Sequence, residues 1–288
     1  MVDAAPGQGP IAIVCGGGSL PGAVAEAVRR RGREPVMFGL RGWADEATIE
    51  RYAHHWIAIG QIGRFFRLAH AAQCRDVLMI GTLLRPPLRQ LRLDWKTIRM
   101  MPGIVAAFRG GDDRLLGGVA RLMENAGFRV IGVGDAAPEV FVPEGPLGSV
   151  KPSERDTGDI VRGLKLIAAL GPFDVGQAAV VANNNVLAVE AAEGTDNMLL
   201  RIAELRKLGR VTAAQGVGVL VKAPKPGQDR RFDLPSIGPR TIENIARAGL
   251  AGLAVTAGST MIAEADRAIA AADRAGIFMI GVREDAAR

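Results

Sequence analysis

Ile11–Gly22 reads IAIVCGGGSLPG, and the expected fold of the 288-residue chain follows from this stretch. Its first five residues are apolar and are followed at once by glycines, which is typical of a short buried strand. Beyond Gly18, apolar residues recur at helical spacing until Gly32, a residue suited to the end of a helix. A strand, a glycine turn and a helix in this order open a βαβ unit. The stretch therefore predicts a parallel sheet at the start of the chain.

Strand-like and helical patterns alternate along the rest of the chain, which predicts an α/β fold made of two α/β domains. After a flexible tail over residues 1–10, residues 11–137 are expected to form a Rossmann-like N-terminal domain. Four prolines and two glycines mark residues 138–156 as the linker. Residues 157–288 are expected to form a C-terminal α/β catalytic domain, with a ligand bound in the cleft between the two domains.

The composition excludes several classes of protein. Hydrophobic residues make up 48% of the chain and charged residues 23%, which is incompatible with global disorder. Two cysteines, Cys15 and Cys74, are too few for a disulfide framework or a four-thiolate zinc site. We expect both to be buried thiols in a reducing compartment. The sequence contains neither a signal peptide nor a membrane-spanning run, so a cytoplasmic protein is expected.

The charge balance favours anionic partners. There are 36 Lys and Arg residues against 30 Asp and Glu residues, a formal net charge of +6. Aromatic residues make up only 5% of the chain, and no dense basic block is interleaved with stacking rings. Nucleic acid is therefore not an expected partner, whereas phosphorylated small molecules or a membrane surface fit better.

The glycine turn has two interpretations. The backbone N–H groups of Gly17, Gly18, Ser19 and Leu20 can approach a phosphate, and the start of the following helix adds partial positive charge. Alternatively, the glycines only permit a tight turn between strand and helix. The spacing matches neither the dinucleotide fingerprint nor a Walker loop. We favour nucleotide or sugar contact, because three consecutive glycines exceed what a turn needs.

Val186–Arg201, VLAVEAAEGTDNMLLR, brings three carboxylates to the end of a predicted strand. The strand delivers Glu190, and Glu193 and Asp196 follow within seven residues. Thr195 or Asp196 would cap the next helix if the stretch were purely structural. Three carboxylates exceed what capping needs, and open α/β sheets bind ligands at the carboxyl ends of their strands. We therefore favour a functional site here.

Lys222–Gly238, KAPKPGQDRRFDLPSIG, forms a mixed-charge loop after a strongly apolar strand. Lys and Arg side chains neutralise phosphoryl charge, and Asp carboxylates together with phosphate oxygens suit Mg²⁺. Apolar residues within the loop would hold it in place, which a plain surface loop does not need. The candidate residues are Lys222, Lys225, Gln228, Asp229, Arg231 and Asp233.

Two other stretches give weaker signals. Gly110–Asp113 places paired acids at a helix start, where we favour capping over metal binding. His54 and His55 are adjacent and would point apart as metal ligands, so surface or core positions are expected for both.

Three motifs together resemble one enzyme family. GGGSLPG, VLAVEAAEGTDNML and KAPKPGQDRRFDLPSIGPRTI are similar to motifs of the two-domain UDP-2,3-diacylglucosamine pyrophosphatases of lipid A biosynthesis, the type unrelated to calcineurin-like metallophosphoesterases. The resemblance runs from Ile11 to Arg283. It implies Mg²⁺-dependent hydrolysis of UDP-2,3-diacylglucosamine to UMP and 2,3-diacylglucosamine 1-phosphate (lipid X). It also implies a cytoplasmic enzyme peripherally associated with the inner membrane of a Gram-negative bacterium.

The resemblance also implies roles for individual residues. The family pattern K-P-x-Q-D-x-R-x-D places the key catalytic acid on Asp229 and a second acid on Asp233. With Glu190, these two are the expected ligands of Mg²⁺, for which Mn²⁺ could substitute. The expected substrate-binding residues are Gly17, Gly18, Ser19, Leu20, Thr195, Asp196, Lys222, Lys225, Gln228 and Arg231.

The acyl chains of such a substrate need an apolar groove. The stretch Leu83–Met101 combines apolar and Arg residues and could supply it, or could form a basic amphipathic helix that packs on the sheet. Two further functions stay open from the sequence: a nucleotide-sugar transferase or other Rossmann-type nucleotide-dependent enzyme, and a non-catalytic lipid- or nucleotide-binding protein. Homodimerisation is also left open.

Overall fold

The chain forms two compact units in the computed structural model, which describes residues 9–83, 94–95, 97–98, 112–173, 175–225, 229–232 and 234–287, with only the backbone at 112–116 and 287. The N-terminal unit comprises Met1–Val140 together with Asp229–Asp233. The C-terminal unit comprises Phe141–Gln228 and Leu234–Arg288. Both units combine helices with a sheet, so the predicted α/β class is confirmed.

The N-terminal unit contains a five-stranded parallel sheet with the strand order β3-β2-β1-β4-β5. The apolar residues of the opening motif form the central strand, which pairs with β2 on one side and β4 on the other. The strands are β1 (Ile11–Cys15), β2 (Pro35–Leu40), β3 (Ala53–Ile57), β4 (Asp76–Ile80) and β5 (Arg129–Val130). Since the strand order changes direction at β1, this is the Rossmann-like arrangement expected from the sequence.

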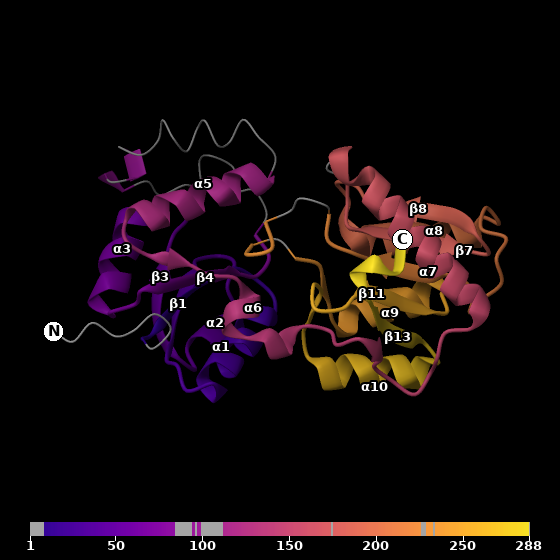
Figure 1. Ribbon diagram of the computed structural model, residues 1–288, viewed down its shortest axis with the longest axis horizontal. Coiled ribbons are helices and arrows are strands. Elements are labelled where there is room, and N and C mark those ends of the chain that lie inside the picture. Colours follow the sequence, from indigo (N-terminus) through magenta and orange to yellow (C-terminus); the bar gives the residue numbers. More distant parts are fainter. Residues whose placement is uncertain are drawn as a thin grey trace. The chain divides into compact units, whose positions relative to one another are not determined.

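Helices cover both faces of this sheet (Figure 1). On one face an aromatic core joins the sheet to two helices, with the rings of Phe38 and Phe65 in an edge-to-face contact at 4.8 Å. Figure 1 shows α5 on one side of the sheet and α1 on the other. The helices are α1 (Leu20–Arg30), α2 (Glu46–Ile49), α3 (Ile62–Ala71), α5 (Asp112–Asn125) and α6 (Val133–Ala136). As predicted, Pro21 lies in the first turn of α1, where a missing N–H costs no helical hydrogen bond.

The C-terminal unit is built on a six-stranded mixed sheet with the order β6-β13-β11-β9-β7-β8. β9, β11 and β13 are parallel, whereas β7 runs antiparallel to both of its neighbours. The strands are β6 (Gly145–Pro146), β7 (Ala178–Ala182), β8 (Asn185–Val189), β9 (Val219–Lys222), β11 (Gly252–Thr256) and β13 (Phe278–Val282). Two short parallel strands, β10 (Ser236–Ile237) and β12 (Met261–Ile262), form a separate pair.

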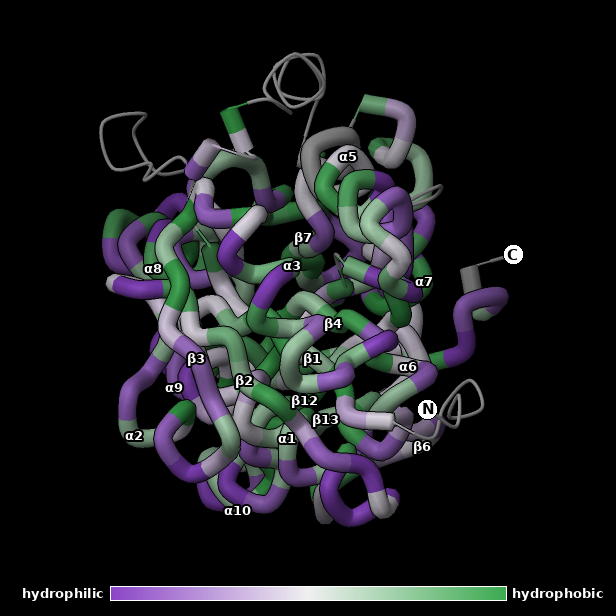
Figure 2. Tube along the Cα trace, turned by 90° about the vertical axis from the view of Figure 1, so that its left-hand side faces the viewer, coloured by the Kyte–Doolittle hydropathy of each residue, from purple (hydrophilic) through white to green (hydrophobic). Residues whose placement is uncertain are grey.

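Each face of this second sheet has its own apolar core. Three helices, α8 (Gly194–Lys207), α9 (Pro239–Ala248) and α10 (Ala265–Ala275), pack on one face. A single long helix, α7 (Glu154–Leu170), packs on the other. Hydrophobic residues recur at helical spacing along these helices with hydrophilic residues between them, and α10 in Figure 2 contains both kinds. This periodicity lets each helix bury one stripe and expose the other.

The residues expected to form a linker, 138–156, are packed parts of both units. A 3₁₀ turn, Pro138–Val140, belongs to the N-terminal unit, and β6 forms the edge of the C-terminal sheet. Proline is tolerated on an edge strand because no neighbour needs its missing N–H. Helix α7 begins at Glu154 because the Ser153 hydroxyl accepts from the Asp156 N–H and the Asp156 carboxylate accepts in return from the Ser153 N–H.

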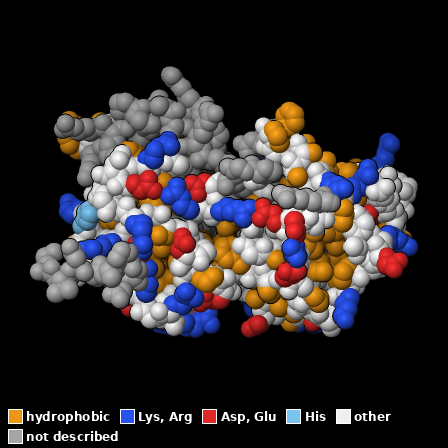
Figure 3. Space-filling model, viewed as in Figure 1, with side chains coloured by type: hydrophobic (Ala, Val, Ile, Leu, Met, Phe, Trp, Pro, Cys, Tyr) orange, Lys and Arg blue, Asp and Glu red, His pale blue; other side chains and the backbone are white. Residues whose placement is uncertain are grey.

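Two other expectations from composition can be compared with the structure. Cys15 and Cys74 are buried free thiols, as predicted, and burial raises the pKa of Cys15 to about 12. Basic side chains are interspersed with acidic ones on the face seen in Figure 3. In the described part of the chain, no helix has the length and apolar character needed to cross a membrane.

A buried ion cluster fixes one end of the N-terminal sheet. The Asp76 carboxylate, of which only 3% is exposed, accepts hydrogen bonds from the guanidinium groups of Arg33 and Arg129 at 2.7 Å each. Arg33 also donates to the carbonyl of Gly9, just before β1. Burial tends to raise the pKa of Asp76, but the hydrogen bonds from Arg129 and Arg33 outweigh it and hold the pKa below its ordinary value. The cluster therefore joins the starts of β1, β4 and β5.

We predict that Asp76→Ala lowers the free energy of unfolding by about 3 kcal/mol near neutral pH, because it leaves two guanidinium groups without their carboxylate. A folded-state pKa below the unfolded value makes this contribution present above the unfolded pKa and lost as the pH falls toward the folded pKa. The difference between variant and wild type should therefore shrink in acid. Denaturant titrations at several pH values measure it.

Glu26→Gln is the matched control, since Glu26 pairs with Arg29 on the exposed face of α1. Equal destabilisation by the two substitutions, or a difference that grows in acid, would contradict this account of Asp76.

Candidate functional site

The glycine turn of the N-terminal unit follows β1 and leads into α1. Gly17 and Thr82 exchange backbone hydrogen bonds of 2.8 and 2.9 Å, so the turn after β1 lies against the turn after β4. A Cβ at Gly16 would lie 2.6 Å from the Thr82 carbonyl oxygen, which explains glycine at this position structurally. Gly18 has a φ of +90° and, with Ser19, is exposed. Gly17 is half-buried and both of its backbone groups are bonded to Thr82, so the part of the turn left for a ligand is Gly18–Leu20, of which Leu20 is half-buried.

In the C-terminal unit, charged residues lie at the carboxyl ends of β8 and β9, the two strands on either side of β7. Lys222 ends β9 and pairs with Ala178, the first residue of β7. The Glu190 N–H, directly after β8, donates to the carbonyl of Ala178 at 2.9 Å. Since β8 and β9 both run antiparallel to β7, their carboxyl ends meet at one edge of the sheet. Glu190 and Lys222 therefore lie at the same edge, on either side of β7.

Thr195 connects these two charged side chains. The Lys222 ammonium donates to the Thr195 hydroxyl at 3.0 Å, and this hydroxyl donates to Glu190 Oε1 at 2.8 Å. Lys222, only 8% exposed, also donates to the Ser236 carbonyl at 3.1 Å. The structure thus brings together three residues singled out from the sequence. We call them the Glu190–Thr195–Lys222 network.

Backbone groups as well as side chains hold the Glu190 carboxylate in place. Its Oε2 atom accepts a hydrogen bond of 2.8 Å from the Gln177 backbone N–H. Gly176 precedes this residue with a φ of +47°, and a Cβ there would collide with the carbonyl oxygen of Glu190. A close approach of two backbones therefore requires glycine at position 176.

The other acidic residues of this stretch have different partners. Asp196 accepts a 2.8 Å hydrogen bond from Asn244 and pairs with Arg240 at 3.1 Å, both on α9. Glu193 pairs with Arg201 at 2.7 Å on the surface of α8. Neither Thr195 nor Asp196 caps α8, because the helix already begins at Gly194. The capping role considered for these two residues is therefore wrong.

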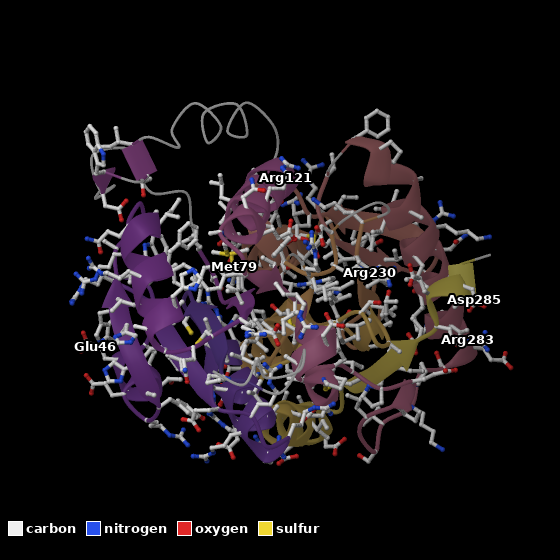
Figure 4. The ribbon with its side chains drawn as sticks, turned by 60° about the vertical axis from the view of Figure 1, so that its left-hand side comes forward. Glu46, Met79, Arg121, Arg230, Arg283 and Asp285 are labelled. Carbon is white, nitrogen blue, oxygen red and sulfur yellow. The ribbon has the colours of Figure 1, made fainter. Side chains whose placement is uncertain are left out.

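Asp229 lies on a short segment that belongs to the N-terminal unit although its neighbours in sequence belong to the other. Its carboxylate accepts from the Arg231 backbone N–H at 3.0 Å and from the Arg231 guanidinium at 2.9 Å. Arg231 also pairs with Glu124 of α5 at 3.0 Å. Phe232 packs against the aromatic core of this unit. Figure 4 shows Arg230 of this segment and Arg121 of α5.

The hydrogen bonds from Arg231 hold the pKa of Asp229 below its ordinary value, and they raise the pKa of Arg231. Asp229 is therefore ionised at neutral pH. A carboxylate with a lowered pKa is a poor proton acceptor but a good hydrogen-bond acceptor or cation ligand. Its chemistry is accordingly that of a fixed negative charge.

The remaining candidates are distributed as follows. Lys225 is half-buried three residues beyond the end of β9, whereas Gln228 and Asp233 lie outside the described residues. So do Gly110 and Gly111, and most of the Leu83–Met101 stretch. No sequence pattern pointed to the Gln177 N–H and the Ser236 carbonyl, because backbone groups of any residue type can fill these roles.

The described carboxylates do not form a metal centre by themselves. Among the residues that the structure describes, no three His, Cys, Asp or Glu side chains gather in a way that could hold a metal ion. Both oxygens of Glu190 accept hydrogen bonds from protein donors, and both oxygens of Asp229 accept from Arg231. Each of these four carboxylate oxygens therefore has a protein donor in the structure.

Comparison with known proteins identifies relatives over nearly the whole chain. A family model described as the LpxI N-terminal domain matches residues 10–140, and one described as the LpxI C-terminal domain matches residues 143–280. The UDP-2,3-diacylglucosamine pyrophosphatase LpxI of Caulobacter vibrioides is 40% identical over 272 residues, which cover 94% of this chain and 97% of that protein.

Two solved structures illustrate a distant similarity. The TT0495 protein from Thermus thermophilus is 14% identical, with 96% of this chain and 98% of that chain covered and a TM-score of 0.30. UDP-glucose-4-epimerase from Stenotrophomonas maltophila is 12% identical, with 97% and 95% covered and a TM-score of 0.29. At these scores neither similarity supports an inference about this chain.

We predict that Gly176→Ala lowers the free energy of unfolding by about 2 kcal/mol or more, because a left-handed residue gains a Cβ that also collides with the Glu190 backbone. Gly209→Ala is the matched control. Gly209 has a φ of +68°, but no described atom lies within 4 Å of a Cβ placed there. Gly209→Ala should lower the free energy of unfolding by only about 1 kcal/mol. Denaturant titration compares the two, and equal losses would contradict the predicted collision.

Proposed function

Since this chain belongs to the LpxI family, we propose that it hydrolyses the pyrophosphate bond of UDP-2,3-diacylglucosamine, releasing UMP and 2,3-diacylglucosamine 1-phosphate in lipid A biosynthesis. The observation that carries this proposal is the 40% identity to the curated Caulobacter enzyme over almost the full length of both chains. The proposal makes the protein a hydrolase acting on a phosphoric anhydride.

The described side chains suit this reaction. A water oxygen attacks one phosphorus, the bridging P–O bond breaks, and the leaving phosphate oxygen keeps the electron pair. This step needs neutralisation of phosphoryl charge and a positioned water. Lys222 and Lys225, with Arg231, are the proposed cationic groups. Asp229, ionised by its contacts with Arg231, is the proposed catalytic residue, whose carboxylate orients the water or binds a cation.

Asp229 is a better orienting group than a general base. General bases work best with a pKa near the working pH, whereas the Arg231 guanidinium keeps the Asp229 pKa low. A carboxylate of this kind can hold a water by accepting its hydrogen bond without removing the proton in advance. Arg231 is then the partner that keeps Asp229 ionised, and its positive charge adds to that available for the phosphates.

We also propose that Mg²⁺, for which Mn²⁺ can substitute, takes part with the substrate bound. Mg²⁺ commonly uses one or two carboxylates together with phosphate oxygens and water. Asp229 offers one such carboxylate, and Asp233 is proposed as the second. Glu190, the third ligand expected from the sequence, would have to give up a hydrogen bond from Gln177 or Thr195 to bind the ion, as Asp229 would have to give up one from Arg231. When bound, the ion would neutralise phosphoryl charge.

The substrate is proposed to contact both units. The exposed turn Gly18–Leu20 is the contact offered by the N-terminal unit, and Lys222 with Thr195 is the contact offered by the C-terminal unit. Because the substrate carries acyl chains, we further propose that the protein works in the cytoplasm at the surface of the inner membrane of a Gram-negative bacterium. Two apolar residues of the Leu83–Met101 stretch, Trp95 at 79% and Leu83 at 45% exposed, support this part.

The first functional prediction concerns Asp229. Asp229→Asn should lower the rate of UMP release at least about a thousandfold, a barrier increase of about 4 kcal/mol, because it removes the fixed charge that orients water or cation. Product release is measured by chromatography of UMP and lipid X, with circular dichroism to confirm the fold. Stoichiometric release of both products without an acceptor also distinguishes a hydrolase from a transferase or a binding protein.

Asp285→Asn is the control for this prediction. Asp285 is an exposed carboxylate paired with Arg283, as Figure 4 shows, and it resembles Asp229 in accepting from an arginine two residues away. It should retain wild-type activity. Activity of Asp229→Asn within tenfold of wild type, with the fold intact, would overturn the assignment of Asp229.

Metal dependence is tested separately. Dialysis against EDTA should abolish UMP release, and added Mg²⁺ should restore it, because the proposed reaction uses the ion to neutralise phosphoryl charge. A thermal unfolding curve of the dialysed protein should be unchanged, since the ion is proposed to bind with the substrate. Full activity in EDTA would show that the basic side chains suffice without a metal.

A further inference from the structure

We infer that Glu190 is a positioning residue, which fixes the Thr195 hydroxyl and through it the ammonium group of Lys222. This inference rests on the proposed function, in which Lys222 meets the pyrophosphate. It gives Glu190 a role different from the metal ligand expected from the sequence. The hydrogen bonds of the Glu190–Thr195–Lys222 network carry the argument.

The direction of each hydrogen bond in this network is fixed by chemistry. An ammonium group only donates and a carboxylate only accepts, whereas a hydroxyl has one proton to donate. The Thr195 hydroxyl must therefore accept from Lys222 and donate its proton to Glu190. If Glu190 did not accept, the proton of Thr195 would be free to turn toward Lys222, where it would repel the ammonium. The carboxylate thus decides which way the hydroxyl points.

Glu190 is itself held in a manner that suits this task. The Gln177 backbone N–H donates to Oε2, which leaves Oε1 directed at Thr195. Gly176 allows the two backbones to approach, and the Glu190 N–H is bound to the carbonyl of Ala178. The carboxylate is therefore anchored to the start of β7 at the sheet edge. Its Oε1 atom contacts Thr195, which in turn contacts Lys222 on the other side of β7.

Lys222 is the member of the network that can act on a phosphate. It is the last residue of β9, at the edge where ligands bind in open α/β sheets, and its side chain is almost fully buried. A buried ammonium is costly unless oxygen atoms surround it, and Thr195 and Ser236 supply two of them. Since a flexible four-carbon stem carries this charge, its place depends on those contacts.

The test uses Glu190→Gln, Thr195→Val and the double variant, assayed by UMP release. Glutamine has one oxygen and one NH₂ group, so it places an acceptor at only one of the two positions where Gln177 and Thr195 donate to Glu190. Each single substitution should lower kcat/KM by about tenfold to a hundredfold, the range expected for a hydrogen bond to a charged group. The double variant should be no worse than Thr195→Val by more than about threefold, because Glu190 acts through Thr195.

Two further measurements separate positioning from metal binding and from folding. The Mg²⁺ concentration for half-maximal activity should be unchanged in Glu190→Gln, and Thr195→Ser should restore most of the activity because it keeps the hydroxyl. Glu193→Gln, a carboxylate of the same loop that pairs with Arg201, should behave as wild type. Thermal unfolding of every variant shows whether the fold is retained.

Several results would overturn the inference. A tenfold rise in the Mg²⁺ concentration that Glu190→Gln needs for half-maximal activity would identify Glu190 as a metal ligand. If the losses of kcat/KM in the two single variants multiply in the double variant, Glu190 acts independently of Thr195. Wild-type activity in Glu190→Gln would show that it has no role in the reaction. If the wild-type protein itself releases no UMP, the proposed function fails first and this inference fails with it.

Discussion

The register of β7 with its two antiparallel neighbours is the constraint on which the candidate site in the C-terminal unit depends. Two antiparallel steps return the chain to its original direction, so β8 and β9 end at the same edge although β7 lies between them. A shift of one residue would turn the side chain of Lys222 to the opposite face of the sheet. The apolar cores on both faces oppose such a shift, because the same residues would then meet solvent or the wrong helices.

The acidic stretch after β8 shows how one cluster of charges can serve three purposes. Glu190 faces the sheet edge, Glu193 stays on the surface of its own helix, and Asp196 contacts α9. Glu190 is connected through Thr195 to Lys222 at the end of β9, whereas Glu193 and Asp196 pair with arginines of α8 and α9. The three carboxylates are close together in the sequence, but the structure gives each of them a different partner.

Sequence patterns predicted the fold better than the details of the site. The apolar run at Ile11–Cys15 and the following glycine turn were enough to predict a parallel Rossmann-like unit, because local periodicity reflects burial. They did not predict that Pro146 would lie in an edge strand, which depends on a partner more than 130 residues away. Nor could they show that Thr195 bridges Glu190 and Lys222, because such contacts depend on strand register. The capping box at Ser153 was a readable signal that was missed.

Residues Asp229–Asp233 fold with the N-terminal unit, and this has an evolutionary consequence. The boundary between the two matched family domains falls near residue 141, yet five residues encoded well beyond it fold with the first unit. Genetic exchange at that boundary would set Arg231 of one parent against the residue at position 124 of the other. The two halves are therefore not interchangeable modules, and sequence changes in α5 and in this segment should be inherited as correlated pairs. Covariation between positions so distant in the sequence would indicate that α5 and this segment have evolved in contact.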